Sequence, residues 1–194
     1  RGIPTENVVV DDCTVYHGHG GFVCGSEMSG GIKNVQVSNN LYIGTDVGLR
    51  FKSTRGRGGV VENIYIRDIN MVNIPNEGLL FDLFYGGKAA GEETEEELAA
   101  RMNADAPEAN EETPAFRNIV VENVNGNNLK RAMYFNGLPE MKIENVTLRN
   151  IKMTATQGAL LRQTNGLIID NVTIIPEQGE AFTIAPTVEN IQRL

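Results

Sequence analysis

The feature that most constrains the fold is a short motif that recurs along the chain. Each copy has an Asn, then apolar and polar residues in alternation, then an Asn or Asp followed by one more residue. Four copies match fully with an apolar last residue, one ends on a polar residue and one begins on Gly. The copies occupy residues 7–13, 34–40, 63–69, 118–124, 145–151 and 166–172. Self-similarity at a period of about 20 to 50 residues is typical of a solenoid, in which coils of the chain stack.

The residues inside each copy favour a β-strand. Apolar and polar side chains alternate, as they do in a strand with one buried face, and Val, Ile, Thr and Tyr suit a pleated surface. A second short run of this kind follows in most units, and Gly and Asn residues suited to turns separate the runs. These second runs are residues 21–24, 48–51, 79–81, 132–135, 159–161 and 181–184.

Two short strands per coil, with no helical period between them, predict an all-β fold, a right-handed parallel β-helix. One coil cannot bury its own apolar face, so the core forms only when coils stack. Asn side chains at the same corner of successive coils can form a ladder, because an amide both donates and accepts hydrogen bonds. A β-sandwich with coincidental spacing is the alternative, and the regular Asn register argues against it.

The spacing of the copies defines the domain. Successive copies begin 27, 29, 55, 27 and 21 residues apart, and the interval of 55 is about two coils. That interval holds the one segment without a β pattern, residues 88–114, which is rich in Glu and Asp. Thr94 as N-cap and Glu97 as its capping partner predict a short helix there, over residues 95–102. We expect one β-helix domain over residues 1–194 with an acidic insertion at about 88–114, a solvated surface segment in preference to a lid over a groove.

Composition excludes several classes of function. The chain has a hydrophobic fraction of 41% and no long apolar run, which argues against a membrane-spanning segment. The net charge of −8 argues against nucleic acid as a partner. Cys13 and Cys24 lie in strand-like runs, and we expect both to be buried small side chains without a redox role. The chain begins at Arg1 directly with a repeat unit, so we expect a β-helix truncated at its N-terminal side, because solenoids end in capping segments.

The candidate functional residues lie in two short segments. One contains Gly18, His19 and Gly20, and the other contains Arg50 and Lys52. Residues two apart on a strand share a face, and Arg50 follows His19 by about one coil, so stacking can bring the three side chains together. Arg and Lys bind carboxylates, and glycines let a bulky ligand approach the backbone. The combination favours a site for an anionic ligand, such as a carboxylated sugar, over a turn histidine and an ordinary solvated face.

Two further arginines are weaker candidates. Arg55 and Arg57 follow the second segment and would extend its basic patch, although an exposed turn explains them equally well.

These motifs resemble those of a known family. The Gly-His-Gly motif around His19, a Gly-Ser pair six residues later and the Arg50-Phe51-Lys52 segment one coil on are similar to motifs of the polygalacturonase class of pectin hydrolases, glycoside hydrolase family 28. Phe51 stands where that family has Ile, a conservative change at an inward strand position. The resemblance implies the same parallel β-helix and covers nearly the whole chain.

The resemblance also implies a role for each residue. His19 would be the catalytic histidine that supports the protonated acid or the water network. Arg50 and Lys52 would bind a galacturonate carboxylate, with Gly18 and Gly20 as further substrate-binding positions. It implies an acidic polysaccharide substrate, inversion at the anomeric carbon, an extracytoplasmic location, and neither cofactor nor metal.

An aromatic residue at a binding subsite is common in that family. The resemblance points to Phe84, Tyr85 and Tyr134 as candidates, and packing in the core is the alternative for each of them.

The family's catalytic carboxylates are missing from this chain. No Asn-Thr-Asp segment occurs, and Asp11-Asp12 lies on the same coil as His19, where the family pair lies about one coil earlier. Asp12 also shares the corner position of the repeat. The resemblance is therefore to the C-terminal part of such a hydrolase, beginning after the acids and inactive or nearly so by itself.

Two other functions remain open. The first is a non-catalytic β-helix that binds acidic polysaccharide or serves a structural role. The second is a uronate lyase, which is disfavoured because clustered oxygen ligands for Ca²⁺ are absent outside the acidic segment. The sequence leaves open whether action is endo or exo, which pectin backbone is bound, and the oligomeric state.

Overall fold

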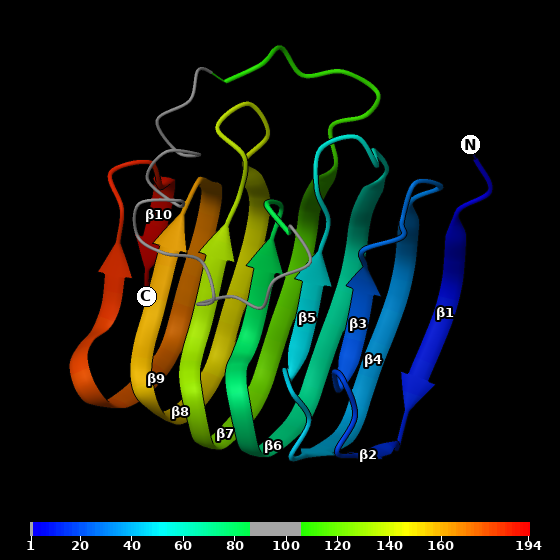
Figure 1. The fold of residues 1–194 in the computed structure, drawn as a ribbon. Coiled ribbons are helices and arrows are strands. Elements are labelled where there is room, and N and C mark those ends of the chain that lie inside the picture. Colours follow the sequence, from blue (N-terminus) through cyan, green and yellow to red (C-terminus); the bar gives the residue numbers. More distant parts are fainter. Residues whose placement is uncertain (1, 86–105) are drawn as a thin grey trace.

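The computed structural model describes residues 2–85 and 106–194 and shows a right-handed parallel β-helix (Figure 1). The chain winds in successive coils, and β1 and β10 lie at opposite ends of the stack. Every strand pairing in the described part is parallel, which confirms the predicted fold class. No helix among these residues is long and apolar enough to cross a membrane.

The strands form one sheet that follows the coils. Its order is β1-β4-β6-β7-β8-β9-β10, with β2 beside β4 and β5 between β3 and β6. The long strands turn the corners of the coil and so contribute to more than one face (Figure 1). The strand bounds are β1 Thr5–Asp11, β2 Thr14–Tyr16, β3 Phe22–Gly25, β4 Ile32–Ile43, β5 Leu49–Lys52, β6 Val60–Asp82, β7 Ala115–Asn136, β8 Ile143–Arg162, β9 Thr164–Ile184 and β10 Glu189–Arg193.

The interval of 55 residues is one coil, so the prediction of two coils was wrong. Ile64 of β6 pairs directly with Ile119 of β7, and Phe81 pairs with Phe135. The surplus residues form the insertion between β6 and β7. Its length is close to that of one coil, so the period alone could not distinguish an insertion from another turn of the solenoid. The expected helix at 95–102 lies outside the described residues.

Asparagine ladders run along the corners of the stack, as the repeat predicted. In the first ladder each Asn donates from Nδ2 to Oδ1 of the Asn one coil earlier, at 3.2 to 3.5 Å. Its members are Asn7, Asn34, Asn63, Asn118 and Asn145. Their φ angles lie between 51° and 57°, in the left-handed region that Asn tolerates better than most residues.

A second ladder occupies the other Asn or Asp position of the repeat. It joins Asp68, Asn123, Asn150 and Asn171 through hydrogen bonds of 2.9 to 3.2 Å. Asp12 has the same left-handed backbone, with φ 53°, which confirms it as a corner residue.

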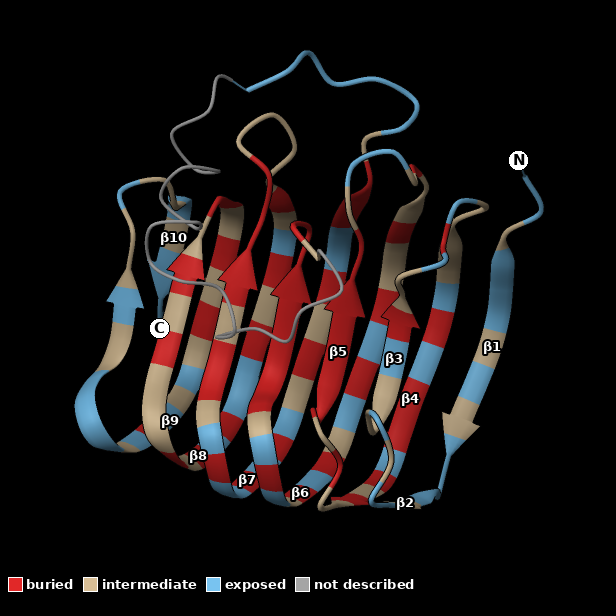
Figure 2. Ribbon diagram, viewed as in Figure 1, coloured by how far each residue is buried: buried red, intermediate tan, exposed pale blue. Residues whose placement is uncertain are grey.

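The core consists of apolar residues that repeat at one position on successive coils. Phe51 stacks on Phe81 with ring centroids 4.5 Å apart, and Phe116 and Phe135 pack against Phe81. Figure 2 shows buried residues alternating with exposed ones along β4, β6, β7 and β8, whereas β1 at the end of the stack is mostly exposed. The alternation confirms the half-buried strands that the sequence indicated.

The two cysteines differ from each other. Cys24 is buried in the core, and burial raises the pKa of its thiol to about 12. Cys13 is exposed, so the prediction of burial was wrong for it. It directly follows the left-handed corner at Asp12 and lies between β1 and β2, where the alternation of a strand no longer applies. Its backbone N–H donates to Asn40 Oδ1 at 2.7 Å.

The ladder predicts a specific order of stabilities. Asn123→Ala should lower the free energy of unfolding by about 2 kcal/mol, since Ala resists a left-handed backbone and removes the amide. Asn123→Gly should lose less, because Gly keeps the backbone conformation. Asn125→Ala removes only a 3.4 Å hydrogen bond to Asn70, without the left-handed backbone, and serves as control. Urea denaturation measures all three. A Gly variant less stable than the Ala variant would contradict the argument from the backbone.

Candidate functional site

The structure brings the three predicted side chains together on one outer face. Phe51 points into the core, so Arg50 and Lys52, its neighbours on β5, point outward. His19 lies in the turn before β3, the strand that pairs with β5. The guanidinium Nη1 of Arg50 is 3.0 Å from His19 Nε2 and donates to the His19 carbonyl oxygen at 3.1 Å.

The contact with Arg50 fixes the tautomer of His19. A guanidinium can only donate hydrogen bonds, so Nε2 of His19 must accept and carries no proton. The proton of the neutral ring then lies on Nδ1, which donates to Asp46 Oδ2 at 2.7 Å. Both nitrogens are engaged, although 71% of the His19 side chain is exposed and can meet a ligand.

Sequence reasoning missed Asp46. It lies 27 residues after His19, which is one coil, and that spacing was the available signal. The resemblance placed the catalytic carboxylates before His19, and so it gave no role to an acid one coil after it.

Arg50 and Lys52 are buried cations that form no salt bridge among the described residues. Arg50 is 5% exposed and Lys52 is 8% exposed, and neither lies within salt-bridge distance of a carboxylate in residues 2–85 and 106–194. Nε of Arg50 also has no hydrogen-bond partner there. A buried cation without a direct ion pair is unfavourable, so this site is electrostatically suited to an anion.

An aromatic ring completes the site. Tyr85 lies three residues after the end of β6, and its ring centroid lies 4.5 Å from Lys52 Nζ and 5.7 Å from the guanidinium carbon of Arg50. These are cation–π distances. Of the three aromatic candidates, Tyr85 is at the site, Phe84 is buried, and Tyr134 lies on a later coil.

Close packing explains why glycines stand on either side of His19. A Cβ on Gly20 would come within 2.4 Å of the Val23 side chain, and one on Gly18 within 2.8 Å of the Val15 side chain. The tight turn that presents His19 therefore requires small residues. Substrate contact at Gly18 and Gly20 stays a prediction.

The two weaker arginine candidates are paired with acids. Arg55 binds both carboxylate oxygens of Glu140, with Nη2 at 2.8 Å from Oε2, and Arg57 binds Glu27. They do not extend the uncompensated charge of Arg50 and Lys52.

Asp11 and Asp12 serve the fold. The Asp11 carboxylate accepts hydrogen bonds from Ser38 and Asn39 on the next coil, which lower its pKa. Asp12 occupies the left-handed corner described above. The described residues contain no cluster of three His, Cys, Asp or Glu side chains able to hold a metal ion.

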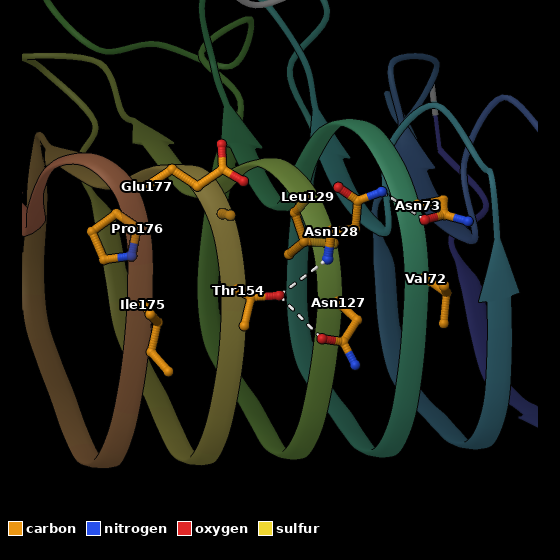
Figure 3. Close-up of a pocket in the computed structure, with 10 residues that line it drawn as sticks. Val72, Asn73, Asn127, Asn128, Leu129, Thr154, Ile175, Pro176 and Glu177 are labelled. Carbon is orange, nitrogen blue, oxygen red and sulfur yellow. Dashed lines mark hydrogen bonds between the residues drawn. The ribbon is translucent and has the colours of Figure 1, made fainter.

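A pocket lies elsewhere on the coils. It has a volume of about 450 Å³ and is lined mainly by Asn and small apolar side chains (Figure 3). Thr154 donates to Asn127 Oδ1 and accepts from the Asn128 backbone N–H, both at 3.1 Å. Its polar groups bond to one another between coils, which suits a structural contact better than a ligand site.

The curated proteins similar to this chain include polygalacturonases. The sequence profile described as "Glycosyl hydrolases family 28" matches residues 3–100. A polygalacturonase of Ralstonia nicotianae is 34% identical over 176 residues, which is 85% of this chain and 29% of the relative. An exo-poly-alpha-D-galacturonosidase of Dickeya chrysanthemi is 35% identical over 82 residues, which is 42% of this chain and 14% of the relative. The chain therefore spans less than a third of the curated relatives it matches.

Solved structures agree with the observed fold. An exopolygalacturonase from Thermotoga maritima aligns with a TM-score of 0.70 and 27% identity, over 89% of this chain and 35% of that protein. A family 28 exopolygalacturonase of Yersinia enterocolitica aligns with a TM-score of 0.69 and 18% identity, over 92% of this chain and 29% of that protein. The second similarity concerns the fold alone.

The hydrogen bonds of His19 predict its tautomer in solution. In the neutral form of His19, nitrogen-15 NMR should show the proton on Nδ1, because Nε2 faces Arg50. Asp46→Ala should shift the population toward the Nε2–H form, since the Nδ1–H group loses its acceptor. His17, the only other histidine, serves as internal control in the same spectra. A wild-type His19 protonated on Nε2, or no change in Asp46→Ala, would refute the arrangement.

Proposed function

Because the chain belongs to glycosyl hydrolases family 28, we propose that it carries the carboxylate-binding part of the active site of a hydrolase that cleaves a galacturonate-containing pectin backbone. The observation that carries the proposal is the pair of buried cations, Arg50 and Lys52, which form no salt bridge with a carboxylate in the described chain. Family membership gives the class of enzyme, and this pair supports an acidic sugar as its ligand.

The ligand chemistry follows from the geometry of the site. A uronate carboxylate would accept hydrogen bonds from Arg50 and Lys52, which are charge-assisted and strong in a buried position. Tyr85 lies over the same cations, so a sugar ring that enters beside it meets an aromatic face. The printed names of the relatives, polygalacturonase and exo-poly-alpha-D-galacturonosidase, support the same substrate class.

His19 is the proposed catalytic residue of this chain. Its exposed ring adjoins Arg50, so it can contact the sugar whose carboxylate Arg50 binds. Asp46 accepts the hydrogen bond of Nδ1–H, holds the ring in one tautomer and one orientation, and acts as a positioning residue. In the proposed reaction His19 supports the protonated acid or the water that attacks the anomeric carbon.

We place the catalytic carboxylates outside this chain. Inverting hydrolysis needs two carboxyl groups roughly 6.5–9.5 Å apart, with room for a water molecule. Asp46 is bound to His19, and Asp11 and Asp12 are used by the fold. The chain by itself is therefore expected to bind substrate without turning it over. The complete protein would invert the anomeric centre, and proton NMR of its first product would show a retained anomer if this is wrong.

The proposed substrate also suggests a location. Pectin is a large extracellular polymer, so we propose that the complete protein acts outside the cytoplasm. Detection of the complete protein only in the cytosolic fraction of its cells would contradict this.

A non-catalytic acidic-polysaccharide binder is the second candidate. The same pair of cations supports it, and fold alone does not decide between them. The two differ in the complete protein: a hydrolase releases new reducing ends from polygalacturonate, and a binder releases none.

Binding of digalacturonate tests the site. Arg50→Met and Lys52→Met should each weaken binding about tenfold or more, because each removes a charge-assisted contact. Isothermal titration calorimetry on the 194-residue chain measures the affinity. Methyl-esterified digalacturonate, which lacks the carboxylate charge, should bind the wild type as weakly as the variants bind the acid.

The control is Lys152→Met, which removes an exposed cation from β8, at a position paired with Asn125 and Thr173. It should bind digalacturonate like the wild type. Unchanged binding in both Arg50→Met and Lys52→Met would refute the proposed site, and release of reducing ends by the isolated chain at ordinary enzyme rates would refute the missing acids.

A further inference from the structure

We infer that the binding face continues from Arg50 and Lys52 to a second pocket for a uronate carboxylate, about three coils toward the C-terminus, with Arg131 and Arg162 as its cations. The identity of the ligand rests on the proposed function, whereas the position of the pocket rests on the register of the strands.

The register places the second pocket on the same face as the first. Lys52 pairs with Asp82, Asp82 with Asn136, and Asn136 with Arg162, so Lys52 and Arg162 occupy one position on four successive coils. Three steps between neighbouring strands amount to about 14 Å. A single sugar ring is too short to reach both side chains, so only a chain of several residues can bind them together.

A pocket lies at the far end of this row. Its volume is about 330 Å³, and it lies over β7, β8 and β9. Its polar lining includes Arg131, Gln157, Arg162, Gln178 and Thr183. Guanidinium, amide and hydroxyl groups match the carboxylate and the hydroxyls of an acidic sugar.

The floor between the two arginines is partly apolar. Leu160 lines the pocket and pairs with Tyr134 on the coil before. Tyr134 pairs with Leu80 one coil earlier, and Leu80 pairs with Arg50. An apolar strip between polar groups suits the apolar face of a sugar ring.

Arg131 is held in place for binding. Its Nη2 donates to Gln157 Oε1, and its guanidinium carbon lies 5.6 Å from the centroid of the Tyr134 ring. A guanidinium has five N–H groups, so others remain for a ligand. A side chain fixed in this way loses little conformational freedom when the ligand binds.

Two acids lie near the arginines. Glu77 is buried, pairs with Arg131 in the register of β6 and β7, and interacts electrostatically with both Arg50 and Arg131. Glu180 lies at the exposed rim of the second pocket and would repel a carboxylate. Removing the Glu180 charge should therefore strengthen binding, an effect opposite in sign to that of removing an arginine.

Ligands of two lengths test the inference on the 194-residue chain. Arg131→Met with Arg162→Met should weaken binding of hexagalacturonate about tenfold and leave binding of digalacturonate, held at Arg50 and Lys52, unchanged. Glu180→Gln should strengthen hexagalacturonate binding.

Lys152→Met again serves as control. Calorimetry measures each affinity, and circular dichroism checks folding. If the double variant is unfolded, Arg162→Gln alone provides the test, since it changes one half-buried side chain.

The outcomes separate this inference from the proposed function. Unchanged hexagalacturonate binding in the arginine variants, or an equal loss for both ligands, would overturn the second pocket. The proposed function would still stand if Arg50→Met and Lys52→Met weaken digalacturonate binding. If those two variants bind digalacturonate like the wild type, the proposed function fails, and the inference that depends on its ligand fails with it.

Discussion

Neighbouring parallel strands lie about 4.8 Å apart, and an Asn side chain at a corner can bridge that distance to the Asn of the next coil. The left-handed backbone at each corner selects Asn, and the amide then joins the coils. Together these constraints fix which residue lies above which. Phe51 stacks on Phe81, and His19 comes within reach of Arg50 and Asp46, because the corners set one register for the stack.

The ladders also explain how the fold accommodates its insertion. Asn118 bonds to Asn63, and Asn123 to Asp68, across 55 residues of sequence, just as other pairs bond across 27. The register depends on the corners and not on the length of chain between them. A solenoid can therefore carry extra residues between β6 and β7 without losing the alignment of the binding face.

Local charge on the binding face differs from the charge of the whole chain. The net charge is −8, which would argue against an acidic ligand if it were spread evenly. Arg50 and Lys52 are nevertheless buried together, whereas Arg55 and Arg57 are neutralised by Glu140 and Glu27. An anion responds to the field at the site, which the nearest uncompensated charges dominate.

The sequence by itself determined the fold and the core of the site. The Asn-centred repeat specified parallel coils, because alternation identifies the buried face and the corner residues recur in register. The spacing of His19, Arg50 and Lys52 then placed them together, as the structure confirms. Tertiary structure alone decided that the interval of 55 is one coil, that Cys13 is exposed, and that Asp46 binds His19. The length of the coil and the contact of Asp46 depend on which segments pair across the stack. The exposure of Cys13 depends on the direction of the backbone after a corner. Local alternation encodes neither. The row from Lys52 to Arg162 is likewise visible only when four coils are aligned, since its members are far apart in sequence and share no motif.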